Sequence, residues 1–179
     1  MNESVLVSDC ARGDNNSRKQ LYDTYAQQMM SICYRYTGDK EVSEDLLHDG
    51  FIRIFETIHQ FQYRGEGSLK AWMSKIFVNI VLAYLKKQAL WEPLSLDNYT
   101  ETNVEKETID EVPNEVLIRF ISELPAGYRT VFNQYVFEEL SHKEIAQALG
   151  INESSSRSQL TRAKAILVNK IKEYRRIYE

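Results

Sequence analysis

The sequence predicts an all-α protein with two small helical domains joined by a flexible linker, the second domain carrying a helix-turn-helix. The 179 residues include only 7 glycines and 3 prolines, which leaves little material for β-turns. Apolar residues recur at helical spacing along most of the chain. Residues 90–113 differ, because they are acidic, weakly periodic and contain Pro93 and Pro113. We therefore expect domains over residues 1–89 and 114–179, with a linker over residues 90–113.

The first domain should begin with two helices. Residues 4–12 favour a short helix, which ends before the Gly13-Asp14 break. Residues 16–36 favour a longer helix, and its inward side follows from the helical spacing. The predicted inward residues are Leu21, Tyr25, Met29, Ile32, Cys33 and Tyr36. Asp39 or Ser43 is expected to cap the helix that follows.

That next helix, in the stretch Glu41–His59, has one apolar and one acidic side. Its apolar stripe consists of Leu47, Phe51, Ile54, Phe55 and Ile58. The opposite side carries Asp45, Asp49, Ile52 and Glu56. Such a side is either a solvated surface or the contact surface for a partner protein.

A basic, aromatic helix follows the turn-rich stretch FQYRGEGS. We expect it to start near Ser68 and to contain no acidic residue. It combines four lysines with three aromatic residues, namely Lys70, Lys75, Lys86, Lys87, Trp72, Phe77 and Tyr84. This composition suits either a core helix or a helix that faces nucleic acid.

The second domain is expected to begin with two short helices. Residues 114–124 form the first, which Pro125 ends. Residues 126–137 form the second, and the spacing predicts Val131, Phe132, Tyr135 and Val136 on its apolar side.

A helix-turn-helix follows. Ser141 and Glu144 fit a capping box, Gly150 supplies the turn, and Asn152 or a following serine caps the second helix. The inward residues of that second helix are Leu160, Ala163, Leu167 and Ile171. The outward residues are Ser155, Ser158, Thr161 and Arg162, flanked by Arg157 and Gln159. Short polar and guanidinium groups on such a helix read base edges in the major groove.

The charge distribution indicates two separate nucleic-acid contacts. The chain has a net charge of −4, but residues 61–90 carry 5 basic and 1 acidic side chain, and residues 141–179 carry 8 and 4. Each of these segments therefore has a net charge of +4, and an acidic stretch separates them.

Several function classes are excluded. The two cysteines lack CxxC spacing, and the three histidines form no ligand cluster, so we expect no metal site. Without a phosphate-binding glycine loop or a nucleophile–base pair, we expect neither a cofactor nor an enzyme. The N-terminal residues do not resemble a signal peptide, and Asn79 interrupts the longest apolar run. We therefore expect a cytoplasmic protein without membrane insertion.

The order of these parts resembles a bacterial RNA polymerase sigma factor of the extracytoplasmic-function group. SEDLLHDGFIRIF resembles the helix that grips the clamp helices of the polymerase largest subunit. FQYRGEGSLKAWMSKIFVNIVLAYL resembles the loop and helix that melt the −10 promoter element and capture a flipped base, with Ala71-Trp72 and Val78-Asn79 as the matching dipeptides. The helix-turn-helix resembles the module that reads the −35 element.

The resemblance implies roles for particular residues. The polymerase-binding residues would be Asp45, Asp49, Ile52, Arg53 and Glu56. The −10 residues would be Phe61, Tyr63, Arg64, Lys70, Trp72, Lys75, Asn79, Lys86 and Lys87, although Trp72 could equally be a core anchor. The −35 residues would be Ser155, Arg157, Ser158, Gln159, Thr161 and Arg162.

The resemblance also implies partners. These are core RNA polymerase, through its clamp helices and its flap, promoter DNA, and an anti-sigma factor. The linker would lie along the active-site and RNA-exit channels of the polymerase, although its acidity also fits simple solvation.

Two residues depart from the family pattern. Ser156 stands on the inward side of the reading helix where relatives usually carry valine, which predicts different packing of its first turn. Thr161 stands where some relatives carry an aromatic residue. The alternative hypothesis is a helix-turn-helix repressor or activator that is not a polymerase subunit, but such a protein would have no use for a second basic, aromatic helix.

Overall fold

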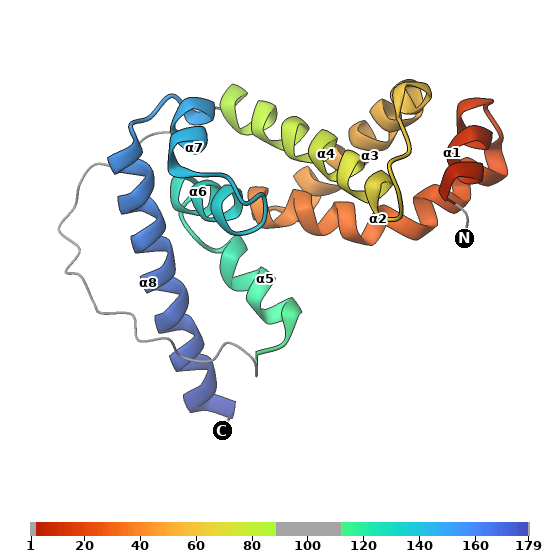
Figure 1. Ribbon diagram of the computed structural model, residues 1–179. Helices are drawn as coiled ribbons and strands as arrows, with labels where there is room; N and C mark the ends of the chain where they lie inside the picture. The colour runs from red at the N-terminus through yellow and green to blue at the C-terminus, as the bar shows by residue number, and fades with distance from the viewer. Residues whose placement is uncertain (1–2, 89–111, 179) are drawn as a thin grey trace. The chain divides into compact units, whose positions relative to one another are not determined.

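The structure is a computed structural model that describes residues 3–88 and 112–178, and it divides into two compact helical units (Figure 1). The first unit ends at Lys87. All regular secondary structure in the described residues is helical. The predicted all-α fold with two helical units, the second carrying a helix-turn-helix, is therefore confirmed. The predicted linker lies outside the described residues, except for Val112 and Pro113.

Unit 1 is a three-helix bundle with a short helix on its side. Its elements are α1 (Glu3–Ala11), α2 (Asn15–Thr37), α3 (Lys40–Thr57), the 3-10 helix η1 (Ile58–Gln60) and α4 (Ser68–Lys87). Helices α2, α3 and α4 pack against one another, and α1 packs against α2 and η1 (Figure 1). The six predicted inward residues of α2 are all buried.

Side-chain caps determine where the helices of unit 1 begin. The Asp14 carboxylate accepts a hydrogen bond from the Ser17 backbone N–H at 2.7 Å, at the start of α2. Helix α2 ends at Gly38, whose φ of 69° is left-handed. The Asp39 carboxylate then accepts from the Val42 N–H at 3.0 Å, so Asp39 caps α3, whereas Ser43 is buried.

Helix α4 supplies much of the core of unit 1. Its buried residues are Leu69, Met73, Phe77, Val78, Val81 and Leu85. Among the described helices, α4 is the one long and apolar enough to span a membrane by length and composition. Its apolar side packs against α2 and α3, however, which is the environment of a core helix in a globular unit.

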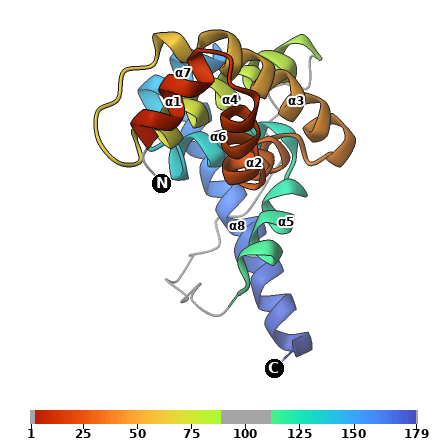
Figure 2. The same cartoon turned by 90° about the vertical axis from the view of Figure 1, so that its right-hand side faces the viewer.

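Unit 2 is arranged along one long helix. Its elements are α5 (Asn114–Ser122), α6 (Ala126–Val136), α7 (His142–Leu149) and α8 (Glu153–Tyr178). Helices α5, α6 and α7 each pack against α8, with α5 beside it in both views (Figures 1 and 2). The predicted inward residues Leu160, Ala163, Leu167 and Ile171 belong to the core of this unit.

The helix-turn-helix consists of α7 and α8. Ser141 and Glu144 form the predicted capping box at the start of α7, and Gly150 has a left-handed φ of 66° at its end. The Asn152 side-chain oxygen accepts from the Ser155 N–H at 2.7 Å, so Asn152 caps α8.

Only two of the four residues predicted on the apolar side of residues 126–137 are buried. Val131 and Phe132 are buried, but Tyr135 is 38% exposed and Val136 is 42% exposed. Arg129 is buried instead. Its guanidinium donates to the backbone carbonyls of Ser122 and Leu124 at the end of α5, and these hydrogen bonds compensate for its burial.

Candidate protein and nucleic-acid interfaces

The outer side of α3 gathers five exposed residues. We call this the α3 face, and it consists of Asp45, Asp49, Ile52, Arg53 and Glu56. Ile52 is 57% exposed, although it is surrounded by charged residues. Arg53 and Glu56 form an exposed ion pair at 3.5 Å, which contributes little to stability. The α3 face is therefore an acidic surface with an exposed apolar residue among its charges.

A short loop connects η1 to α4, and two glycines shape it. Gly65 has a φ of 113° and Gly67 a φ of 82°, which L side chains rarely adopt. The Ser68 hydroxyl donates to the Gly65 carbonyl at 2.6 Å and accepts from the Arg64 N–H at 3.2 Å. The loop thus has a fixed turn at its base, while Tyr63 is 48% exposed.

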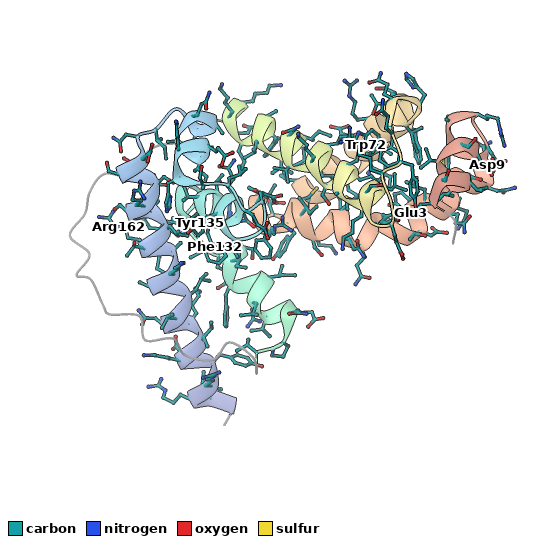
Figure 3. The ribbon with its side chains drawn as sticks, in the orientation of Figure 1. Glu3, Asp9, Trp72, Phe132, Tyr135 and Arg162 are labelled. Atoms are coloured by element: carbon teal, nitrogen blue, oxygen red, sulfur yellow. The ribbon has the colours of Figure 1, made fainter. Side chains whose placement is uncertain are left out.

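The structure brings Phe61 and Trp72 together at the start of α4. Their ring centroids are 5.3 Å apart, and both side chains are half-buried. Trp72 therefore lies at the edge of unit 1, beside the loop, rather than among its fully buried residues (Figure 3). An aromatic pair with one side open to solvent can stack against a further planar group.

The remaining −10 candidates on α4 are exposed. Lys75, Asn79 and Lys87 lie on one row of the helix with four-residue spacing, together with the exposed Ala71 and Ala83. Lys70 and Lys86 are exposed on the adjacent row. By helix geometry, Asn79 lies roughly 10 Å further along α4 than Trp72. The exposed side of α4 therefore carries four lysines and one uncharged amide, and the loop before it adds Arg64 and Glu66, both exposed.

The outer side of α8 in its first turns carries the −35 candidates. Arg157 and Thr161 are exposed, and the Thr161 hydroxyl donates to the Arg157 carbonyl at 3.0 Å. Arg157 also pairs with Glu153 at 2.8 Å. Because this pair is exposed, the guanidinium can exchange its partner for a phosphate or a base at little cost.

The other four −35 candidates are half-buried. They are Ser155, Ser158, Gln159 and Arg162. The Arg162 guanidinium donates to the Tyr128 hydroxyl on α6 at 3.3 Å. Figure 3 labels Arg162 on α8 and Tyr135 on the neighbouring α6. Arg162 is thus already oriented by α6, whereas Arg157 is free to turn outward.

One polar cluster in the helix-turn-helix was not anticipated from the sequence. The His142 Nδ1 and the Ser156 Oγ are 2.9 Å apart, and the His142 ring stacks on Tyr135 with centroids 4.8 Å apart. The Lys164 ammonium lies 5.6 Å from the Tyr135 ring centroid. The inward position of Ser156 was the available signal, but its partner lies 14 residues away on another helix.

The described residues contain no group of three or more His, Cys, Asp or Glu side chains that could hold a metal ion. Cys10 and Cys33 are buried, and burial raises the pKa of their thiols to about 11 and about 12. Neither thiol is therefore activated as a nucleophile.

Comparison with known proteins identifies both units. Residues 21–90 match the family "Sigma-70 region 2", and residues 114–167 match "Sigma-70, region 4". Together these ranges take in more than half of the chain. Among curated relatives, the ECF RNA polymerase sigma factor SigM of Bacillus subtilis is 28% identical over 148 residues, covering 81% of this chain and 89% of the relative. The ECF RNA polymerase sigma-E factor of Escherichia coli K12 is 25% identical over 184 residues, covering 96% and 95%.

Two solved structures have similar helices. One contains the sigma factor RpoE with the anti-sigma factor NepR from Bartonella quintana, at 16% identity and a TM-score of 0.49, covering 86% of this chain and 96% of that chain. The other contains CnrH with the cytosolic domain of CnrY, at 16% identity and a TM-score of 0.47, covering 94% and 96%.

The family matches assign both units to sigma-70 regions. The similarity to the two curated relatives covers 81% and 96% of the chain. The chain therefore belongs to the sigma-70 family, in its extracytoplasmic-function group, and is a transcription initiation sigma factor.

Proposed function

We propose that this sigma factor binds core RNA polymerase through the α3 face, opens the −10 element with α4 and the loop before it, and reads the −35 element with the first turns of α8. In this proposal residues 1–89 form region 2, residues 114–179 form region 4, and residues 90–113 lie along the polymerase channels. The protein acts in the cytoplasm, where promoter DNA and polymerase are its partners. We assign it no catalytic activity of its own.

One observation carries the proposal: α4 presents an exposed basic surface in a different unit from the helix-turn-helix. A repressor needs one DNA-reading element, whereas initiation requires both recognition of duplex DNA and its opening. The exposed lysines of α4 suit phosphate contacts, and the aromatic pair Phe61–Trp72 suits stacking with an unpaired base.

In this proposal, the loop before α4 holds a base that leaves the stack when the promoter opens. Extruding a base from the stack costs a few kcal/mol, which the protein must offset by stacking and hydrogen bonding. Tyr63 is exposed on the loop, and the Asn79 side chain offers both a donor and an acceptor. The Asn79 side chain is exposed and makes no hydrogen bond to another described residue, so its amide group is available to DNA.

The α3 face supplies the first test. Asp49→Lys reverses a charge in its centre, and Ile52→Glu removes its exposed apolar residue. Because neither side chain contributes to the core, both variants should fold while their affinity for core polymerase falls on the order of tenfold or more. Circular dichroism checks the fold, and fluorescence anisotropy of labelled protein measures core binding.

Glu44→Lys is the matched control. Glu44 is also an exposed acid on α3, but helix geometry places it off the α3 face, and it pairs with Lys40 at 3.7 Å. We expect this variant to bind core polymerase like the parent. Parental affinity for Asp49→Lys and Ile52→Glu would remove the α3 face from the interface. A parent chain that binds promoter DNA but not core polymerase would favour the repressor hypothesis.

The anti-sigma factor stays a prediction from the family resemblance. Co-purification of the tagged chain from cells without the inducing stress would test it.

A further inference from the structure

The polar cluster around Ser156 connects all three helices that surround the DNA-reading turn. His142 is the first residue of α7, Tyr135 lies near the end of α6, and Ser156 lies in the first turn of α8. Ser156 is 0% exposed, and it sits directly between the −35 candidates Ser155 and Arg157. A contact that moves Ser156 therefore moves two DNA-facing residues with it.

The hydrogen bond of the Ser156 hydroxyl indicates which nitrogen of the His142 ring carries a proton. A buried O–H donor requires an acceptor. Among the described residues, its hydrogen-bond partner is the His142 Nδ1 at 2.9 Å. If Nδ1 carried a proton, the serine hydrogen would be left without an acceptor. This hydrogen-bond pattern assigns Nδ1 as the acceptor and places the proton of a neutral ring on Nε2.

We propose that His142 and Ser156 are positioning residues for −35 recognition: their hydrogen bond fixes the first turn of α8 and thereby sets which bases Ser155 and Arg157 reach. The proposal rests on the proposed function of α8. Tyr135 supports the pair, because its ring stacks on the imidazole and limits rotation of the His142 side chain. Neither His142 nor Ser156 is itself required to touch DNA.

The charges around His142 favour its neutral form. Burial lowers its pKa below the ordinary 6.5, Arg157 and Lys164 lower it further, and Glu153 opposes them. All three charged groups lie on α8, while α6 contributes Tyr135. Because the folded pKa is lowered, the stabilisation by neutral His142 is complete above about pH 6.5 and is lost as the pH falls through the folded pKa. We therefore expect acidification to weaken the hydrogen bond between His142 and Ser156 and to loosen the first turn of α8.

Two substitutions of His142 distinguish the roles of its two ring nitrogens. His142→Asn keeps an acceptor close to the position of Nδ1, whereas His142→Gln keeps a polar group close to the position of Nε2. Ser156→Ala removes the hydroxyl from the other side. Ser122→Ala is the matched control, since Ser122 is also a buried serine of unit 2 but bonds the Arg119 carbonyl in α5.

The experiment uses the full chain assembled with core polymerase. The holoenzyme selects from a duplex library randomised over the −35 region, and sequencing gives the base preference at each position. We expect His142→Gln and Ser156→Ala to lose roughly two- to tenfold of the preference at the positions read by the first turn. His142→Asn and Ser122→Ala should retain the parental profile. Thermal melting and core affinity control for general unfolding.

A second arm repeats the selection between pH 7.5 and 5.5. The parental preference should weaken at the acidic end, whereas the His142→Asn preference should not change with pH in this way. Parental profiles for both His142→Gln and Ser156→Ala would overturn the proposal. Retention by His142→Gln with loss by His142→Asn would also overturn it, in favour of direct contact between Nε2 and DNA.

The selection distinguishes a failure of this positioning role from a failure of the proposed function of α8. If the parental holoenzyme selected no −35 sequence, the assignment of α8 would fail before the variants were compared. If the parent selects a sequence and all variants match it, only the positioning role fails.

Discussion

At the scale of single residues, the two arginines on the outer side of α8 differ in how they are held. Arg162 is half-buried and donates to Tyr128, so its direction is already set by α6. Arg157 is exposed, and within residues 3–88 and 112–178 its guanidinium pairs with Glu153. Arg157 is therefore the side chain that can reorganise on meeting DNA, and its role can be tested with little disturbance of the fold.

We predict that Arg157→Ala changes the −35 preference. A guanidinium that binds guanine bidentately should cost about 1–3 kcal/mol when it is lost, and specificity should relax at one base pair. A guanidinium that binds phosphate would weaken all sequences equally and reduce the salt dependence. Binding of the holoenzyme to a panel of −35 variants distinguishes these cases. An unchanged profile and unchanged affinity would exclude Arg157 from the interface.

A second prediction for single residues concerns the opening of promoter DNA. Asn79→Ala and Tyr63→Ala should leave core binding and −35 binding intact, because both side chains are exposed, but should reduce opening of duplex promoters on the order of tenfold. Permanganate reactivity of −10 thymines measures this. A template with a pre-melted −10 bubble should restore part of the loss for a residue that acts in melting, and less for one that recognises the captured base.

Gln28→Ala is the control for these two variants, because Gln28 is an exposed polar residue on α2, outside the α4 surface. It should open promoters like the parent. Parental opening by both Asn79→Ala and Tyr63→Ala would remove the loop and this part of α4 from the mechanism.

At the scale of helices, the close approach of α3 and α4 connects the two proposed interfaces of unit 1. A Cβ at Gly50 would lie 2.1 Å from the Phe77 ring, which is itself fully buried and contacts Phe51 with centroids 5.6 Å apart. A methyl group at position 50 would therefore overlap a ring that is enclosed by the core. Gly50 permits the contact between the helix that carries the α3 face and the helix that carries the proposed −10 surface.

We predict that Gly50→Ala lowers the free energy of unfolding by about 1–3 kcal/mol, even though alanine favours helices by up to about 1 kcal/mol over glycine. Urea unfolding followed by circular dichroism measures this. Introducing the same change into a Phe77→Leu background should cost less, since the overlapping ring atoms are gone. An equal cost in both backgrounds would mean that the ring is not the cause.

The sequence predicted the helices better than their contacts. Local signals were sufficient for the capping box at Ser141 and for the left-handed turn at Gly150. Asp39 and Ser43 could not be separated, because both can cap a helix, until Ser43 was seen to be buried. Tyr135 was predicted to face the core because periodicity marks apolar residues, whereas burial of Arg129 depends on carbonyl groups at the end of another helix.

At the scale of the whole molecule, the alternation of charge along the chain corresponds to the division into units. The positive segment at residues 61–90 includes α4, and the one at residues 141–179 includes α7 and α8. The sequence therefore predicted that each unit carries one positively charged segment. The contacts within each unit, such as Phe61 with Trp72 and His142 with Ser156, were not predictable, because they join residues whose proximity depends on tertiary packing.

In the proposed function, one chain gives core polymerase two separate DNA specificities. Transcription of genomic fragments by core polymerase, with and without the chain, followed by sequencing of RNA 5′ ends, tests this most directly. We predict that the chain creates new start sites, all preceded by a shared motif in two parts, near −35 and near −10. Identical 5′ ends with and without the chain, or new start sites that share only one of the two parts, would refute this function.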